Sequence, residues 1–158
     1  MRAASSWAAR LVVGASVAAC ALASVPARAA GPVAASARRI SLNETGRLHL
    51  TSKHGFTLNE EGLATGTIRG RIYLHLKIVS TNRVTAEVGI YPNGGSLTGK
   101  VAANYHVAGA NASFSGTMSI VRGTGSYRNA RGVGLGFSGT IRRTNDAVTV
   151  HLTGDLSI

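Results

Sequence analysis

The sequence predicts an all-β fold, a small closed antiparallel barrel of about eight strands. Apolar and polar residues alternate with a period of about two through much of the chain after residue 40, as in strands with one buried face. Ser/Thr-Gly-X tripeptides recur within these runs, at residues 65–67, 98–100, 115–117, 138–140 and 153–155. Because glycine lets a strand bend or approach another backbone closely, these positions favour closure of the sheet into a barrel.

Residues 1–29 predict a secretory signal peptide that is cleaved after Ala29. Basic residues without acids precede an apolar run over 11–22, and residues 27–29 form a small-x-small cleavage signal. The run is shorter than the ~20 residues that a membrane span needs, so no transmembrane span is expected in the mature chain. An alternative stays open, because residues 17–20 loosely fit a bacterial lipobox that would anchor a lipoprotein through Cys20.

Residues 30–40 are expected to form a flexible linker, and residues 41–158 a single β-barrel domain. Cys20 is the only cysteine, so the mature domain relies on packing and not on disulfides. The formal net charge is +11, which favours adhesion to anionic surfaces. The basic residues are scattered and export argues against nucleic acid, so no specific nucleic-acid partner is expected. A homo-oligomer is left open.

The alternating runs place the strands in chain order. They lie around residues 47–51, 63–69, 72–78, 84–91, 101–107, 114–120, 135–141 and 148–152. Turn residues separate the later runs, and such short up-and-down connections favour a meander that closes on itself. Aromatic residues are only 5% of the chain, too few for the two interfacial girdles of a membrane barrel. We therefore expect a soluble barrel with its apolar face inside.

A two-residue turn at Asn93-Gly94 predicts the register of the central hairpins. It places Glu87 opposite Lys100, and the preceding hairpin places His75 opposite Glu87. These three residues are the polar-face candidates. An exposed row of ion pairs is favoured over a catalytic carboxylate at Glu87.

One shared interior is predicted to receive the apolar side chains of the last strands. Its members are Phe114, Met118, Ile120, Leu135, Phe137, Ile141, Val148, Val150 and Leu152. The candidates for lining a ligand cavity within it are Tyr105, Phe114, Met118, Phe137 and Leu152.

Residues 121–132 form the most informative motif. Gly123 and Gly125 are expected to permit positive-φ turns after a strand that ends near Val121. Tyr127 is expected to plug the barrel end, and Gly132 to end a short helical turn before the next strand.

This motif resembles the Gly-Thr-Gly-x-aromatic-Arg-x-Ala-Arg-Gly segment of plant dirigent proteins and, more loosely, the glycine-rich turn of allene oxide cyclases. The matching residues include Gly123, Thr124, Gly125, Tyr127, Arg128, Arg131 and Gly132. The resemblance implies their calycin-like, eight-stranded antiparallel barrel with an apolar cavity, and a structural role for the turn. Plant dirigents normally contain a disulfide that the mature chain lacks, and their polar pocket residues do not align here. Radical coupling or epoxide cyclisation is therefore implied by resemblance alone.

Other catalytic or metal motifs are not expected. The five histidines are dispersed, without a short pair at metal-ligand spacing. No Gly-x-Ser-x-Gly elbow appears, and no Lys-Ser/Thr pair follows Gly123-Thr124-Gly125 as a phosphate loop requires. We expect no metal and no cofactor.

The leading hypothesis is a secreted, cofactor-free barrel that binds an apolar small molecule or acts at the cell envelope through its basic surface. A cyclase, isomerase or dirigent-type protein that uses the cavity to control a substrate's conformation is the first alternative. A module that binds another protein or an anionic polymer is the second. A cavity of ~300 Å³ or more with a convergent carboxylate or tyrosine would favour the enzyme. A filled interior would favour a surface-acting protein.

Overall fold

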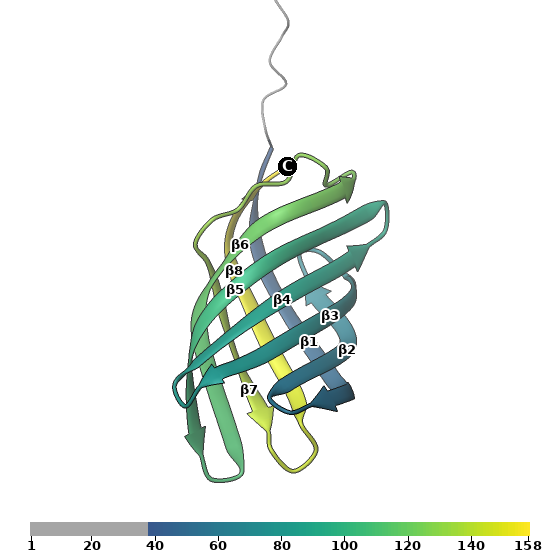
Figure 1. Ribbon diagram of the computed structural model, residues 1–158. Coiled ribbons are helices and arrows are strands. Elements are labelled where there is room, and N and C mark those ends of the chain that lie inside the picture. The colour runs from purple at the N-terminus through teal and green to yellow at the C-terminus, as the bar shows by residue number, and fades with distance from the viewer. Residues whose placement is uncertain (1–37) are drawn as a thin grey trace, which may run out of the picture. The chain divides into compact units, whose positions relative to one another are not determined.

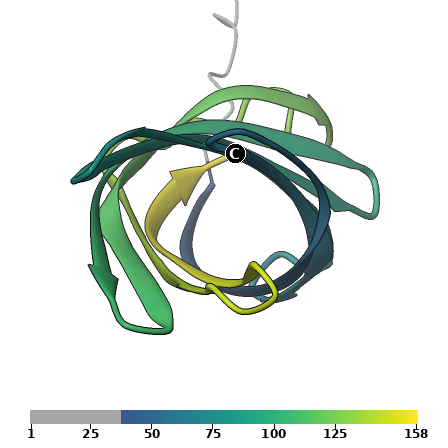
Figure 2. The same cartoon turned by 60° about the horizontal axis from the view of Figure 1, so that its bottom comes forward.

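The computed structural model describes residues 38–158, which form a closed barrel of eight antiparallel strands in sequence order, with β1 closing on β8 (Figures 1 and 2). The predicted all-β barrel is confirmed, and residues 38–158 contain no helix. None of them therefore belongs to a helix long and apolar enough to cross a membrane. The strands are β1 (Arg39–His54), β2 (Thr57–Gly66), β3 (Gly70–Ser80), β4 (Arg83–Pro92), β5 (Gly95–Ala108), β6 (Asn111–Gly125), β7 (Leu135–Arg142) and β8 (Ala147–Ser157).

The first two strands differ from the expected bounds. β1 begins at Arg39, within the segment assigned to the linker, and β2 occupies residues 57–66 where a strand over 63–69 was expected. The early half of β2 was missed because a glutamate, Glu60, takes an inward-facing position and breaks the apolar alternation. The predicted signal peptide, Cys20 and the linker up to residue 37 lie outside the described residues.

The predicted register of the central hairpins is confirmed. Glu87 pairs with Lys100 across β4 and β5, and His75 pairs with Glu87 across β3 and β4. The turn at residues 93–94 has Gly94 at φ +89°, in the left-handed region that glycine adopts most readily.

The predicted interior is also confirmed. All of its members are buried except Ile120, which is half-buried and packs against the same core. The Phe114 and Phe137 rings stack with centroids 5.2 Å apart. Gly139 makes room for them, because a Cβ at this position would lie 2.4 Å from Cζ of Phe114. Glycine within a strand here serves close packing.

The two ends of the barrel differ. At one end, Ile68 from the β2–β3 connection and Tyr127 and Ala130 from the β6–β7 segment pack onto the core. We call this the closed end; it is the upper end in Figure 1. The hairpin loops β1–β2, β3–β4, β5–β6 and β7–β8 surround the other end, which we call the open end and which comes forward in Figure 2.

The expected geometry of the 121–132 motif needs correction. β6 does not end near Val121 but continues to Gly125, where it pairs with Gly95 of β5. Gly125 has a positive φ of +56°, whereas Gly123 is not in that region. Gly123 is needed for close approach instead, because a Cβ there would lie 1.8 Å from the carbonyl oxygen of Tyr127.

The helical turn expected before Gly132 is also absent from the described residues. The segment folds as hydrogen-bonded turns, in which the Tyr127 amide donates to the Thr124 carbonyl and the Ala130 amide to the Tyr127 carbonyl. The positive φ before β7 falls on Gly134, at +68°. Successive tight turns thus connect β6 to β7 and place Tyr127 and Ala130 against the core.

Candidate ligand-binding site

A hollow of about 870 Å³ opens at the open end of the barrel. Its apolar floor includes the buried side chains of Leu58 and Ile141. Its rim carries three large apolar side chains that face solvent: Phe56 is 74% exposed, Val79 57% and Val107 43%. The hollow therefore combines a buried apolar floor with an exposed apolar rim.

Backbone hydrogen bonds between neighbouring loops hold this rim. Gly55, at φ +58°, forms the tight β1–β2 turn, and the carbonyl of Phe56 accepts a hydrogen bond of 2.9 Å from the Ile78 amide. The Tyr105 amide donates to the carbonyl of Asn82 at 2.8 Å. The rim is thus largely formed before any ligand arrives, which lowers the entropic cost of binding.

The charged side chains around the hollow are mostly basic. Lys53 Nζ lies 2.7 Å from Asp146 Oδ2, and both residues line the hollow together with His106 and Arg143. The Arg143 guanidinium donates to the Gly109 carbonyl at 2.8 Å. Asp146 is the only acid among these lining residues, so the mouth offers more positive than negative charge.

A buried carboxyl group lies deeper on the same strand as Leu58. Glu60 is the next inward-facing residue of β2, paired with Leu50 and Leu74, and neither of its carboxyl oxygens has a hydrogen-bond partner within residues 38–158. Burial raises the pKa of Glu60 to about 8, and the negative charge of Asp146 adds to the rise. At neutral pH this group is therefore mainly the uncharged acid.

A second buried carboxyl group belongs to the closed end. Glu44 of β1 is buried, and its Oε1 accepts a hydrogen bond from the Ile68 amide. Burial raises the pKa of Glu44, and the hydrogen bonds from Ile68 and Thr67 oppose that rise. Glu44 therefore anchors the connection that brings Ile68 onto the core.

The cavity-lining candidates separate into two groups. Tyr105 lines the hollow. Phe114, Met118, Phe137 and Leu152 instead lie in the packed core.

The polar-face candidates His75, Glu87 and Lys100 are exposed on the outside of the barrel. Within residues 38–158, Glu87 forms no ion pair with either neighbour, and the His75 ring contacts the Asn59 side chain instead.

The residues of the 121–132 motif lie at the closed end, at the opposite end of the strands from the hollow. Ser96 Oγ and Thr124 Oγ1 are 2.7 Å apart. Arg131 and Ser157 exchange backbone hydrogen bonds of 2.8 and 2.9 Å, which join the β6–β7 segment to the end of β8, and Arg128 is exposed. These contacts are structural, and none of the motif residues lines the hollow.

The two buried glutamates were missed by sequence reasoning, although a signal was present. Leu42, Gly46 and Leu48 share the period-two face of Glu44. Successive side chains of a strand point to opposite faces, so one of the two neighbouring carboxyl groups of Glu60 and Glu61 must face inward if they lie in a strand. The rim residue Phe56 left no such signal, because its exposure depends on loops that are distant in sequence.

Comparisons with protein-family models, with curated proteins and with solved structures found no match to this chain. Within residues 38–158, no three His, Cys, Asp or Glu side chains gather where they could hold a metal ion.

Proposed function

We propose that the open end of the barrel binds an amphipathic small molecule with an apolar body and an anionic head. The observation that carries the proposal is the exposed rim of Phe56, Val79 and Val107 around a preformed hollow. Contiguous exposed apolar groups on a small domain commonly mark a binding site. The volume of about 870 Å³ also falls in the usual range for small-molecule pockets.

The charges at the mouth support the choice of head group. Lys53, His106 and Arg143 line the hollow with a single acid, Asp146, which already pairs with Lys53. An anionic head placed there gains attraction from Arg143, which forms no ion pair within residues 38–158. The apolar body would then extend toward Leu58 and Ile141.

A fluorescent fatty-acid probe tests this proposal on the purified protein. We expect saturable binding, and weaker binding of the matched fatty alcohol, which lacks the charge. The double variant Phe56→Ser/Val79→Ser should weaken binding about tenfold or more through lost apolar contact. Val133→Ser is the matched control, since Val133 is 86% exposed but belongs to the β6–β7 segment. Equal affinities for all three proteins would contradict the proposal.

An enzymatic use of the same hollow is the second candidate, in the form of a cofactor-free cyclase or isomerase. Glu60 does not line the hollow itself, but it is the next inward-facing residue after Leu58, which does, and its uncharged carboxyl could donate a proton to a substrate that reaches past Leu58. A lipid epoxide offered to the protein should then give product with a stereochemical excess. Glu60→Gln should remove the turnover but keep the probe affinity. Product formation no faster than without protein would reject the activity.

We also propose that the protein acts outside the cytoplasm, on the basis of the leader pattern in residues 1–29. Intact mass measurement of the protein recovered from its own culture should give a chain that begins at Ala30. A lipid-modified chain that begins at Cys20 would instead establish the lipoprotein form.

A further inference from the structure

A second, separate concavity of about 260 Å³ lies on the outer face of the sheet and crosses strands β1 to β5. It shares no lining residue with the hollow at the open end. Its centre is a row of paired positions in which Gly89 of β4 lies between Tyr73 of β3 and Thr98 of β5. We call this concavity the outer groove.

Gly89 gives the outer groove its depth. Its backbone is not in the left-handed region, so its conformation does not require glycine. A Cβ at Gly89 would instead lie 3.0 Å from Cε2 of Tyr91. The missing side chain thus leaves room for the Tyr91 ring, which lies against the Gly89 backbone.

Two exposed tyrosines form one wall. The rings of Tyr73 and Tyr91 meet edge to face, with centroids 5.4 Å apart and planes at 89°. The guanidinium of Arg71 lies 5.6 Å from the centre of the Tyr73 ring. These contacts restrict the side chain of Tyr73 and leave both tyrosines accessible to solvent.

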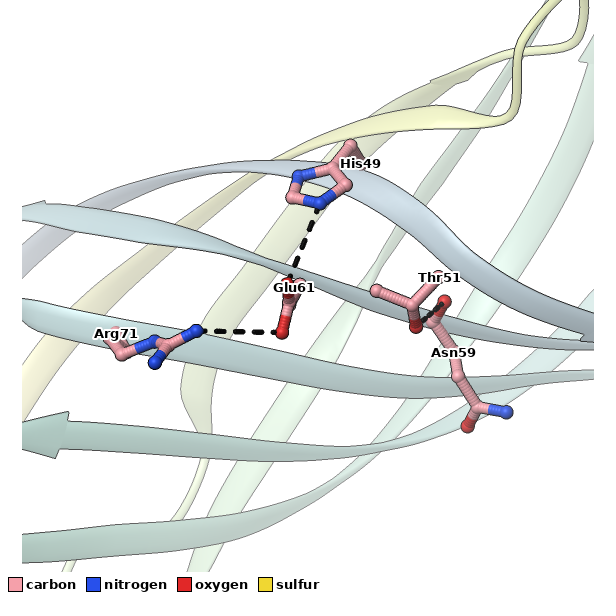
Figure 3. A network of polar contacts seen from close by, with 5 residues as sticks. All are labelled: His49, Thr51, Asn59, Glu61 and Arg71. Atoms are coloured by element: carbon pink, nitrogen blue, oxygen red, sulfur yellow. Dashed lines mark hydrogen bonds and ion pairs between the residues drawn. The ribbon is translucent and has the colours of Figure 1, made fainter.

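Polar side chains in fixed positions complete the groove (Figure 3). Glu61 lies between His49 Nε2 and Arg71 Nη2, at 3.6 and 3.7 Å. Thr51 Oγ1 donates to the Asn59 carbonyl at 2.8 Å. Glu87, His75 and Thr98 add further hydrogen-bonding groups from the neighbouring strands.

The charge of the outer groove is opposite to that of the chain. The chain has 17 lysines and arginines against 6 acids, yet the residues that line the groove include three acids, Glu60, Glu61 and Glu87, and no lysine or arginine. The nearby cation Arg71 lies at the edge of the groove and is paired with Glu61. The lining therefore supplies no lysine or arginine of its own to hold an anionic ligand. The chemistry suits a ligand with apolar faces and many neutral hydroxyl groups.

We propose that the outer groove binds a neutral saccharide. The C–H face of a pyranose ring would pack on an accessible tyrosine face, and its hydroxyls would bond to planar carboxylate and amide groups such as Glu87 and Asn59. Two tyrosines held by their neighbours provide that surface at low conformational cost.

NMR titration of the full protein with neutral oligosaccharides of glucose, mannose and N-acetylglucosamine tests the proposal. At least one should shift the backbone amide signals of Tyr73, Gly89 and Tyr91 to saturation, whereas an oligogalacturonate, which is anionic, should not. Tyr73→Ala and Tyr91→Ala should each weaken binding about tenfold or more. Gly89→Val, which fills the centre of the groove, should do the same.

Phe56→Ser is the matched control, because it removes an exposed aromatic side chain at the open end and should leave saccharide affinity unchanged. Dispersed amide spectra confirm that each variant is folded. The proposal is overturned if none of the three neutral saccharides shifts the groove amides, or if the tyrosine variants bind as tightly as the wild type. Either result would leave Tyr73 and Tyr91 as a cross-strand pair that only stabilises the sheet.

Discussion

The closed and open ends of the barrel differ in where their apolar side chains go. The closed end turns Ile68, Tyr127 and Ala130 inward, whereas the open end leaves Phe56, Val79 and Val107 exposed around a hollow. The same strands reach both ends, so the difference arises in the connections. The β6–β7 segment over residues 126–134 is long enough to cover one end, and the short hairpin loops at the other end are not.

The buried carboxyl groups repeat this contrast. Glu44, toward the closed end, accepts a hydrogen bond from Ile68. Among the described residues, both carboxyl oxygens of Glu60 lack a hydrogen-bond partner, whereas only Oε2 of Glu44 does, and burial raises the pKa of Glu60 to about 8. A hydrogen-bonded buried carboxyl holds a connection in place, whereas a buried carboxyl without a hydrogen bond lowers the stability of the fold.

Two glycines with nearly the same φ give the largest expected difference between the ends. Gly125 has φ +56°, and a Cβ there would lie 2.0 Å from the Gly94 carbonyl oxygen; Gly55 has φ +58° and nothing within 4 Å. Gly125→Val should lower the free energy of unfolding by about 4 kcal/mol or more. Gly55→Ala should cost only about 1–2 kcal/mol of backbone strain. Urea unfolding of both variants measures the difference, and equal losses would contradict the distinction.

Glu60→Gln should stabilise the protein at alkaline pH by an amount on the order of 3 kcal/mol. The folded pKa of about 8 exceeds the value of 4.5 for a free glutamate. The contribution of Glu60 is therefore fully present below about pH 4.5 and is lost as pH rises to about 8, because the folded state holds its proton more tightly. Urea unfolding from pH 4 to pH 9 should show the two proteins diverging as pH rises. A constant difference across this range would place the Glu60 pKa near its ordinary value.

Asp146→Asn should produce a smaller effect at the open end. The charge of Asp146 contributes to the raised pKa of Glu60, so its removal should lower that pKa while burial keeps it above 4.5. Carboxyl ¹³C NMR titration of Glu60 measures the shift. Glu44, whose pKa is raised without a contribution from Asp146, is the internal control. An unchanged Glu60 titration would show that the two carboxylates do not interact.

The smallest expected effect comes from the exposed ion pair at the mouth. Lys53→Met removes the contact with Asp146. The Lys53 side chain is about half exposed in the unmodified protein. The loss should be at most about 1 kcal/mol and should fade at high salt. Thermal unfolding at low and high salt checks this. A loss that persists at high salt would indicate packing by the lysine stem instead.

The central hairpins were the most predictable part of the molecule. The Asn93-Gly94 turn fixes the pairing of β4 with β5, and regular alternation extends it to β3. The predicted position of β2 was too late in the chain, because the inward-facing Glu60 does not continue the apolar alternation. The hollow could not be predicted, since its rim unites Phe56, Val79 and Val107 from separate strand ends and loops. Its existence depends on relative loop lengths, which strand periodicity does not describe.

The most direct measurement of the open end's proposed role is paramagnetic broadening of backbone amide signals by a spin-labelled fatty acid. We expect the signals of Phe56, Val79 and Val107 to broaden at low probe concentration, while those of Tyr127 and Ala130 stay sharp. Addition of unlabelled fatty acid should restore the broadened signals. Broadening centred on Tyr127 and Ala130, or spread evenly over both ends, would contradict a ligand site at the open end.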